Sequence, residues 1–288
     1  MLPQKYDFYL ADNDAGRRIH YKLRYQVYCL REKFEDPSSH PSFLEQDQYD
    51  DISAHFIVRS RATGEWLGAM RLIIAPVQKL PVSRISSMDL KNFPGIPGKG
   101  VAEASRLCTL IPTSPRSNSA PDTKKARNRH AGPHHLISHA LQTSWITVGL
   151  ISAVRQYSLA HEILYCFFLI SDPLARMLRR LGMEIDPVGS PCFHRGWRRP
   201  YMHNFKTGYQ TMRARSPELY KVFCRRTAYA RYSEVDGVPE VLPLAACGGD
   251  QQSVDLGSGL REPSRTSSDQ RDREHHERSP RGPTALRF

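Results

Sequence analysis

Hydrophobic and polar positions alternate with two different periods along the first part of the chain. Over residues 18–34 the apolar side chains recur every three or four positions, which predicts an amphipathic helix. Residues 55–59 and 66–74 are apolar runs rich in branched side chains, and the turn signal between them predicts an antiparallel hairpin. A similar run predicts a third long strand over residues 101–111. The helical positions are Ile19, Leu23, Val27 and Leu30, and the turn signal is Ala62-Thr63-Gly64.

The same patterns continue in the second half of the chain. They predict a helix around residues 135–157, an apolar strand at 163–170, a helix at 172–181 and a short strand near 183–188. Residues 136–154 lack Lys, Arg, Asp and Glu and are long enough to span a bilayer. Several His, Gln, Thr and Ser side chains interrupt this stretch, which favours a core helix over a membrane span.

Two segments fall outside these patterns. Residues 246–288 are rich in Gly, Ser, Asp, Arg and Pro and nearly free of large apolar side chains, which predicts a disordered tail. Residues 112–133 contain four prolines and a cluster of basic side chains, which predicts a long basic surface loop. We therefore expect a single folded domain over residues 1–245 that carries this loop as an insertion.

The net charge of the chain lies in the predicted folded domain. The 288 residues include 41 Lys and Arg against 29 Asp and Glu, a formal net charge of +12 at pH 7, and the tail is neutral with seven Arg and seven Asp or Glu. A hydrophobic content of 40% excludes wholesale disorder. The six Cys show no regular spacing, which argues against a disulfide framework or a zinc ribbon. Because the N-terminus also lacks the apolar run of a signal peptide, we expect a cytoplasmic protein.

Three charged residues stand inside otherwise apolar strands, where a polar group is costly unless it is paired. They are Arg71, Glu103 and Arg106. In a regular pleat Glu103 shares a face with Ser105 while Arg106 points to the other face, but a β-bulge would bring them together. Two interpretations stay open: a structural ion pair between Arg71 and Glu103 across neighbouring strands, or an active site beside a bulge.

A second group of candidate residues lies around the predicted first helix. Arg24 and Tyr28 are one helical turn apart and share a face, and Phe34 follows them. An acidic stretch then precedes the hairpin. Taken alone, such a stretch is more often a solvated loop than a site, so both interpretations stay open. The acidic residues are Glu45, Asp47, Asp50 and Asp51.

Read together, these residues resemble a known family. The segments RYQVY (24–28), FE (34–35), DQYD (47–50), His55, GAMRLI (68–73) and EASRL (103–107) follow the order and spacing of the N-acylhomoserine-lactone synthases. The segments LRRLGM (178–183), VG (188–189) and HRGWRRPY (194–201) are similar to the PEP-CTERM/exosortase system-associated acyltransferases. That group is related to the lactone synthases and to N-acyl amino acid synthases. The resemblance covers residues 5 to 230.

The resemblance implies an α/β (α+β) fold of the GNAT type, with helices flanking a twisted mixed central sheet. It also implies transfer of a fatty acyl group from a carrier thioester to the amine of an amino acid or related small molecule. Phe34 stands where the lactone synthases have Trp, which leaves S-adenosylmethionine open as the acceptor. In that family the residues matching Arg24, Asp47, Asp50, Arg71, Glu103 and Arg106 form a charged network beside the amine pocket, and those matching Tyr28 and Phe34 shape it.

The chemistry of acyl transfer suggests roles for the strand residues. An amine must lose a proton before it attacks a thioester carbonyl, and a partly buried carboxylate can accept that proton, so Glu103 is the candidate base. Ser105 is a candidate proton donor to the leaving thiolate, although a serine in a strand is more often a bystander. Arg71 and Arg106 could hold the network or a substrate carboxylate, and backbone N–H groups of a bulged strand could stabilise the oxyanion.

A missing motif indicates the acyl donor. GNAT enzymes that use acyl-CoA place a glycine-containing phosphate loop directly after the central strand. Here that place holds Pro112-Thr-Ser-Pro-Arg116, with no glycine before Gly132. The sequence therefore favours an acidic acyl carrier protein over acyl-CoA as the donor, with no tightly bound cofactor. The residues predicted to dock the carrier are Lys124, Lys125, Arg127 and Arg129.

Two other kinds of site compete with this interpretation. His134, His135 and His139 form an HHxxxH pattern, but no Glu accompanies them, so we predict no metal site. Residues 193–209 interleave aromatic and cationic side chains, as proteins that bind single-stranded nucleic acid do. Single-stranded nucleic-acid binding is therefore the alternative function, although Gly196 and Pro200 indicate a shaped loop between strands.

Overall fold

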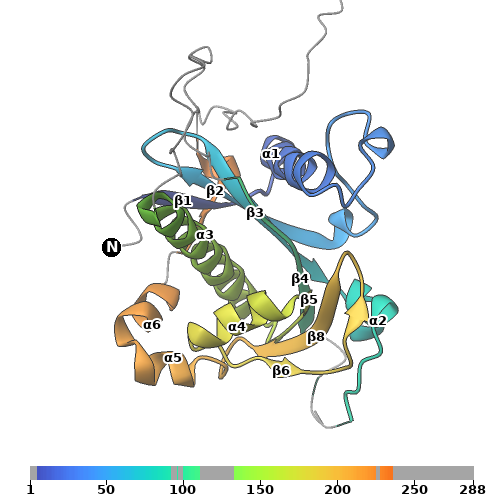
Figure 1. The fold of residues 1–288 in the computed structure, drawn as a ribbon, viewed down its shortest axis with the longest axis vertical. Helices are drawn as coiled ribbons and strands as arrows, with labels where there is room; N and C mark the ends of the chain where they lie inside the picture. The colour runs from blue at the N-terminus through green and yellow to red at the C-terminus, as the bar shows by residue number, and fades with distance from the viewer. Residues whose placement is uncertain (1–4, 92–95, 97–99, 111–132, 225–227, 236–288) are drawn as a thin grey trace, which may run out of the picture. The chain divides into compact units, whose positions relative to one another are not determined.

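One mixed β-sheet organises the described part of the chain, which comprises residues 5–91, 96, 100–110, 133–224 and 228–235 of a computed structural model (Figure 1). The strand order is β6-β8-β5-β4-β3-β2-β1-β9, and β7 pairs with β8. The pairs β4–β5 and β1–β9 are parallel and the other pairs are antiparallel. The strands are β1 Tyr6–Leu10, β2 Ser53–Ser60, β3 Trp66–Ile74, β4 Val101–Thr109, β5 Tyr165–Ile170, β6 Asp186–Pro187, β7 Cys192–Phe193, β8 Trp197–Asn204 and β9 Ala230–Arg231.

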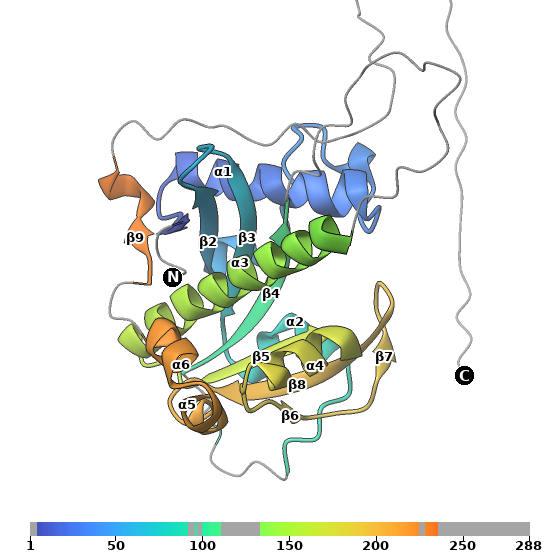
Figure 2. The same cartoon turned by 60° about the vertical axis from the view of Figure 1, so that its left-hand side comes forward.

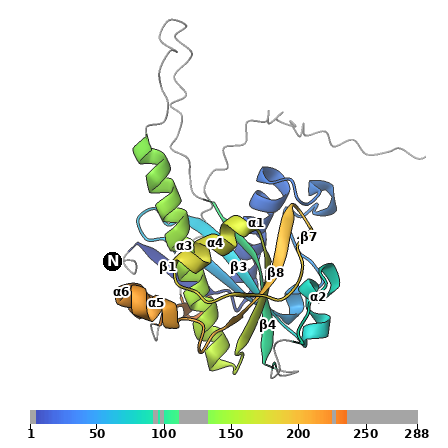
Figure 3. The same cartoon turned by 60° about the horizontal axis from the view of Figure 1, so that its bottom comes forward.

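Helices cover both faces of this sheet (Figure 2). Helix α1 packs Ile19 and Leu23 against Ile57 of β2, whereas the core on the opposite face joins Val154 of α3 to Phe56. Helix α2 lies on the other side of the sheet from α3 and α4 (Figure 3). No helix in the described ranges has the length and apolar character of a membrane span. The helices are α1 Asp14–Arg24, the π-helix η2 Tyr25–Arg31, α2 Pro81–Ile85, α3 Pro133–Ala160, α4 Asp172–Arg180, α5 Gln210–Arg215 and α6 Pro217–Phe223.

The predicted elements form, with changed boundaries. The hairpin and the strand starting at Val101 are confirmed. The first helix begins at Asp14 instead of Arg18, because the side chain of Asn13 accepts the N–H of Gly16 at 2.8 Å and caps it. Its last part is a π-helix ending at Arg31, a form that is frequent at functional sites.

Elements without a strong period were missed. Neither β1 nor β8 was predicted, and the short strand near residues 183–188 shrinks to β6. The prediction of a loop around Pro200 is wrong, since Pro200 lies inside β8 opposite Leu169. Gly196 does form the turn before that strand, with φ of 98°. Residues 112–132 of the predicted basic loop and the whole predicted tail lie outside the described residues.

Two irregularities in β4 position the site. In the described part of the sheet, β4 pairs with β5 only from Val101 to Glu103, so the two strands separate beyond that point. On its other edge β4 pairs Ser105 with Arg71 and Cys108 with Ala69, so one residue of β3 lies opposite two of β4. This is a β-bulge, and it lies just beyond the point where β4 separates from β5.

We expect Gly182→Ala to destabilise the protein. Gly182 ends α4 with φ of 84°, and a Cβ there would lie 2.6 Å from Cα of Met212. The left-handed backbone and the forced shift together cost about 2–4 kcal/mol of unfolding free energy. Gly196→Ala is the matched control, because Gly196 also has positive φ but nothing lies within 4 Å of an added Cβ. Chemical denaturation measures both variants, and equal losses would contradict the steric argument.

Candidate active site

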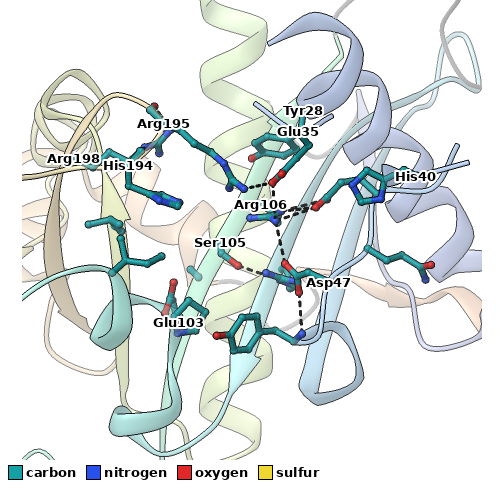
Figure 4. A pocket seen from close by; sticks show the side chains of 18 residues that line it. Tyr28, Glu35, His40, Asp47, Glu103, Ser105, Arg106, His194, Arg195 and Arg198 are labelled. Carbon is teal, nitrogen blue, oxygen red and sulfur yellow. Dashed lines mark hydrogen bonds and ion pairs between the residues drawn. The ribbon is translucent and has the colours of Figure 1, made fainter. Parts of the chain in front are cut away.

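The β4 bulge gathers the predicted catalytic residues at one cavity. Arg106, at the bulge, adopts φ of 53°. Glu103, Ser105 and Arg106 all line a polar cavity of about 350 Å³, a size typical of small-molecule sites. Of the two interpretations that the sequence left open, the structure has the bulge, and the bulge brings these side chains together (Figure 4).

The walls of this polar cavity come from segments far apart in the chain. Residues 35–49 close one side, α2 contributes Pro81 and Ile85, and the β7–β8 hairpin closes another side. The lining residues are Tyr28, Glu35, His40, Glu45, Gln46, Asp47, Tyr49, Arg71, Pro81, Ile85, Glu103, Ala104, Ser105, Arg106, Leu169, His194, Arg195 and Arg198.

One wall of this cavity is a network of three arginines and three carboxylates, which extends from the lining residues into the core behind them. Arg24, which is fully buried, binds Glu45 and donates to Asp50 at 2.6 Å. Arg71 donates to Asp50 at 2.7 Å and to Asp47 at 2.5 Å. Arg106 donates to Glu45 at 2.9 Å and to Asp47 at 3.0 Å. Each carboxylate thus contacts at least two guanidinium groups.

Burial and pairing set the charge state of this arginine–carboxylate network. Burial by itself would raise the pKa of Glu45, but Arg24 and Arg106 outweigh it and lower that pKa to about 2. The pKa of Asp50 is likewise about 2, because Arg24 and Arg71 overcome its desolvation. The solvated-loop interpretation of the acidic stretch is wrong for these two residues, which are only 1% and 6% exposed.

Glu103 has a different environment. It is 4% exposed, and one carboxylate oxygen accepts the N–H of Val82 at 2.7 Å. Burial raises the pKa of Glu103 to about 7, against smaller opposing effects of the Val82 N–H and of Arg71. The alternative interpretation, an Arg71–Glu103 ion pair, is wrong for these described residues, because the strand register places Glu103 opposite Ile73 and Arg71 binds the acids instead.

The neighbouring polar groups hold β4 in this shape. The Ser105 hydroxyl oxygen accepts from Nε of Arg71 at 3.1 Å. The Tyr28 hydroxyl donates to the carbonyl of Leu107 at 3.0 Å, beside the bulge. The Arg106 guanidinium lies 5.4 Å from the centroid of the Tyr28 ring, within cation–π range.

Three predicted binding residues lie near the polar cavity without lining it. Arg24 and Asp50 are buried behind its wall in the network. Phe34 is 37% exposed, with its ring centroid 6.2 Å from that of Tyr28. The predicted carrier-docking residues, which are Lys124, Lys125, Arg127 and Arg129, lie outside the described residues.

The β7–β8 hairpin supplies site residues that were not predicted as such. Arg195 binds Glu35 across the cavity, and His194 and Arg198 line it (Figure 4). The available signal was their place in the segment 194–201 that resembles the acyltransferases. The nucleic-acid alternative finds no support, because three of its aromatic residues are core side chains with 2% exposure each: Tyr201, Phe205 and Tyr209.

A second, apolar cavity of about 120 Å³ lies on the opposite face of the sheet, between the strands and helices α3 and α4. It meets the polar cavity where β4 and β5 separate. Residues that line both are Tyr28, Ala104, Ser105, Arg106, Leu169 and Arg198. The apolar lining includes Met70, Ile151, Val154, Phe168, Leu174, Leu178 and Met183.

The described residues contain no cluster of three or more His, Cys, Asp or Glu that could hold a metal ion. The side chains of His134, His135 and His139 lie outside this description. The five described cysteines are free thiols: Cys29, Cys108, Cys166, Cys192 and Cys224.

Comparison with known proteins places this geometry in a class. Residues 23–114 match the family model of the acetyltransferase (GNAT) domain. The fold is similar to BjaI, a CoA-dependent acyl-homoserine lactone synthase solved with SAM and isopentyl-CoA, at 16% identity and a TM-score of 0.51, covering 79% of this chain and 92% of that chain. TofI, in a ternary complex with an inhibitor and MTA, is similar at 16% identity and a TM-score of 0.50, covering 74% and 99%.

A third similar structure is FeeM, an N-acyl amino acid synthase from uncultured soil microbes. It has 16% identity and a TM-score of 0.44, covering 73% of this chain and 96% of that chain, a likeness too distant to carry weight. No curated protein matches the sequence.

The chain therefore contains a GNAT domain, and it is an acyltransferase. More particularly, its fold is that of the acyl-homoserine lactone synthases, which confirms the mixed, helix-flanked sheet predicted from the sequence. At 16% identity the likeness defines the fold and leaves the substrates to the site itself.

Replacing Arg24 by Met tests the arginine–carboxylate network. Removing one partner of a buried ion pair costs about 3–5 kcal/mol, so Arg24→Met is expected to lose this much stability at pH 7. The folded-state pKa values of Glu45 and Asp50 are lowered, so the stability that they contribute is present above their unfolded-state pKa values near 4 and is lost as pH falls toward 2. The difference in unfolding free energy between wild type and Arg24→Met should therefore narrow as pH falls from about 4 toward 2.

The matched control for that variant is Arg17→Met on the same helix. Arg17 pairs with Asp14 at the surface, so its loss should cost no more than about 0.5 kcal/mol. Urea unfolding from pH 3 to 7 measures both variants. A pH-independent loss in Arg24→Met, or one no larger than in the control, contradicts the role of the network.

Proposed function

We propose that this acyltransferase moves a fatty acyl group from a thioester to the amine of an amino acid or related small molecule. The observation that carries the proposal is the meeting of an apolar and a polar cavity at the β4 bulge, beside Glu103. The apolar cavity suits an acyl chain, and the polar cavity suits a charged amine. The thioester carbonyl would then lie between β4 and β5, where the strands separate.

Glu103 acts as the base in this proposal. A carboxylate with a pKa near 7 can accept a proton at neutral pH and return it later. The ammonium group of the acceptor gives one proton to Glu103, and the neutral nitrogen attacks the thioester carbonyl. As the C–N bond forms, backbone N–H groups of the bulged strand stabilise the oxyanion. The C–S bond then breaks as the Ser105 hydroxyl gives its proton to the departing thiolate. The nitrogen passes its second proton to the Ser105 oxygen, which restores the hydroxyl, and Glu103 later releases the first proton to solvent.

In this proposal the arginine–carboxylate network holds the wall of the polar cavity beside which acyl transfer takes place. Arg71 fixes Ser105 by donating to its hydroxyl oxygen, which leaves the hydroxyl proton directed elsewhere. Arg24 and Asp50 act as positioning residues because they are buried behind the cavity. The proposed contacts with the acceptor come from the lining residues Tyr28, Asp47 and Arg106, with Phe34 shaping the entrance next to Tyr28.

An acyl carrier protein is the donor that we propose, in preference to acyl-CoA. The support is the sequence after β4, which lacks a glycine-containing phosphate loop and carries five basic residues against Asp122 between residues 112 and 135. BjaI, which shares the fold, is described as CoA-dependent, so the fold itself is compatible with either donor. A cytoplasmic location and a link to a PEP-CTERM/exosortase system stay predictions from the sequence.

Glu103→Gln tests the base. The variant keeps the size of the side chain and can still accept the Val82 N–H, but it cannot take a proton, so acyl transfer should fall by about 100-fold or more. Wild-type kcat/KM should rise with pH and level off above about 7, following ionisation of Glu103. Enzyme assays of the purified variant, with Glu218→Gln at an exposed position as control, measure both effects.

The same Glu103→Gln substitution should stabilise the protein at high pH. Because the folded-state pKa of Glu103 is raised, its stabilising contribution is complete below about pH 4.5 and is lost as pH rises through 7. Glu103→Gln removes this loss, so it should be more stable than wild type at pH 8 by up to about 3 kcal/mol, and equal to it near pH 4. Thermal unfolding at both pH values measures this difference in stability.

In the acyl-transfer assay, near-wild-type activity of the folded Glu103→Gln variant would exclude Glu103 as the base.

Charge reversal in the basic loop tests the carrier protein. Changing Lys124, Lys125, Arg127 and Arg129 to Glu should raise KM for an acyl carrier protein substrate by at least about tenfold, because an acidic partner would meet repulsion. Reversal of Arg213 and Arg215 on α5 is the control. An unchanged KM for the carrier protein in the charge-reversed variant contradicts the proposed donor. A wild-type KM that is lower for acyl-CoA than for the carrier protein also contradicts it.

A further inference from the structure

Most charges in the polar cavity are already neutralised. Arg71 and Arg106 form ion pairs with Asp47, Asp50 and Glu45. Arg195 at the rim is paired with Glu35. The positive charge of these arginines is therefore compensated by acids of the protein, although the sequence suggested Arg71 and Arg106 as partners for a substrate carboxylate.

Arg198 is the exception among the cationic side chains of this cavity. Its Nε donates to the carbonyl of His194 at 2.9 Å and its Nη2 approaches the carbonyl of Arg195 at 3.4 Å. No acidic residue of the described ranges lies within ion-pair distance of it. A guanidinium has five N–H donors, so at least three remain available. Burial lowers the pKa of Arg198, and the nearby Arg195 and Arg106 act in the same direction.

Glu103 is the matching exception among the acids. It forms no ion pair with any described residue, and its single described partner is the backbone N–H of Val82. Along β8 the residues Tyr201 and His203 face α3 and α4 with the partners Phe168 and Cys166, so the alternation assigns Arg198 to the other face, as it does Glu103. Arg198 lies where the two cavities meet and lines both of them, whereas Glu103 lines the polar cavity only. In Figure 4 both residues lie on the same side of Ser105, away from Asp47.

We infer that the acceptor carries a free α-carboxylate, and that this carboxylate binds Arg198 while the amine faces Glu103. An α-amino acid is a zwitterion, and the cavity offers one uncompensated group of each sign to receive it. A carboxylate can bind the guanidinium with two parallel hydrogen bonds, which also orients the amine. This inference rests on the proposed function, and it extends it by assigning the subsite that selects the acceptor.

The experiment compares acceptors with and without the carboxylate. A panel of L-amino acids and the corresponding amino acid amides is assayed with one acyl donor, using wild type, Arg198→Met and Arg198→Lys. Wild type should prefer the best amino acid over its amide by roughly 10- to 100-fold in kcat/KM, the usual effect of a charge-assisted hydrogen bond. Arg198→Met should remove this preference by raising KM for the amino acid, and Arg198→Lys should restore part of it.

Three readouts separate this inference from other roles of Arg198. KM for the amide and for the acyl donor should stay within about threefold of wild type in Arg198→Met, whereas a structural defect would change all of them. Arg180→Met, at an exposed arginine of α4, should behave as wild type. A rise in KM for the donor alone shows that Arg198 binds a phosphate of the donor and overturns the inference. Equal use of amino acids and amides by wild type also overturns it.

A binding measurement decides the inference without turnover. N-decanoyl amino acids and their amides, which are the products of the two reactions, are titrated into the full chain by calorimetry. Tighter binding of the carboxylate form, lost in Arg198→Met, supports the subsite, and equal binding of the two forms refutes it. Absence of acyl transfer to every amine, amides included, would instead refute the proposed function.

Discussion

The buried ion-pair network is the constraint on which the rest of the site depends. Four of the six charged groups are buried, which is expensive, and ion pairs in good geometry offset the cost. These four are Arg24, Arg71, Glu45 and Asp50. Arg24, Arg71 and Arg106 come from α1, β3 and β4, and their partners come from one short stretch, residues 45–50. These ion pairs fix residues 45–50 against three elements at once, and so build one wall of the polar cavity.

The bulge in β4 follows from the same constraint. In a regular strand the Arg106 side chain would point toward α3, away from the carboxylates that it binds in the structure. With φ of 53° it turns to Glu45 and Asp47 instead. Such a backbone conformation costs about 1–3 kcal/mol, which the ion pairs and the Tyr28 hydrogen bond to Leu107 offset. Because the acids of residues 45–50 saturate the arginines, Glu103 is left without a cation, and burial can raise its pKa.

The sequence allowed β2, β3, β4 and β5 to be predicted and the β4 bulge to be considered, because apolar runs and charged residues in apolar strands are local signals. The burial of Glu45 was not predictable in this way, since its partners Arg24 and Arg106 lie 21 and 61 residues away. Strand β8 was missed because Pro200 and two arginines hide its period. Arg198 was assigned to a nucleic-acid surface for the same reason: local composition shows an exposed basic segment, and only the register with β5 turns it toward the cavity.

The distribution of charge separates two tasks within one small volume. Paired charges hold the backbone, and the unpaired Glu103 and Arg198 remain available for chemistry and recognition. The sheet separates the environments further, because the side chains of β4 alternate between its faces. In the proposed reaction an acyl chain on the α3 and α4 face contacts Met70 and Phe168, while Glu103 and Asp47 line only the polar cavity. We place the reacting carbonyl where β4 leaves β5, since both cavities share Ala104, Ser105 and Leu169 there. Under this proposal the separation of the two strands lets an apolar substrate and a zwitterion meet, each in an environment that suits it.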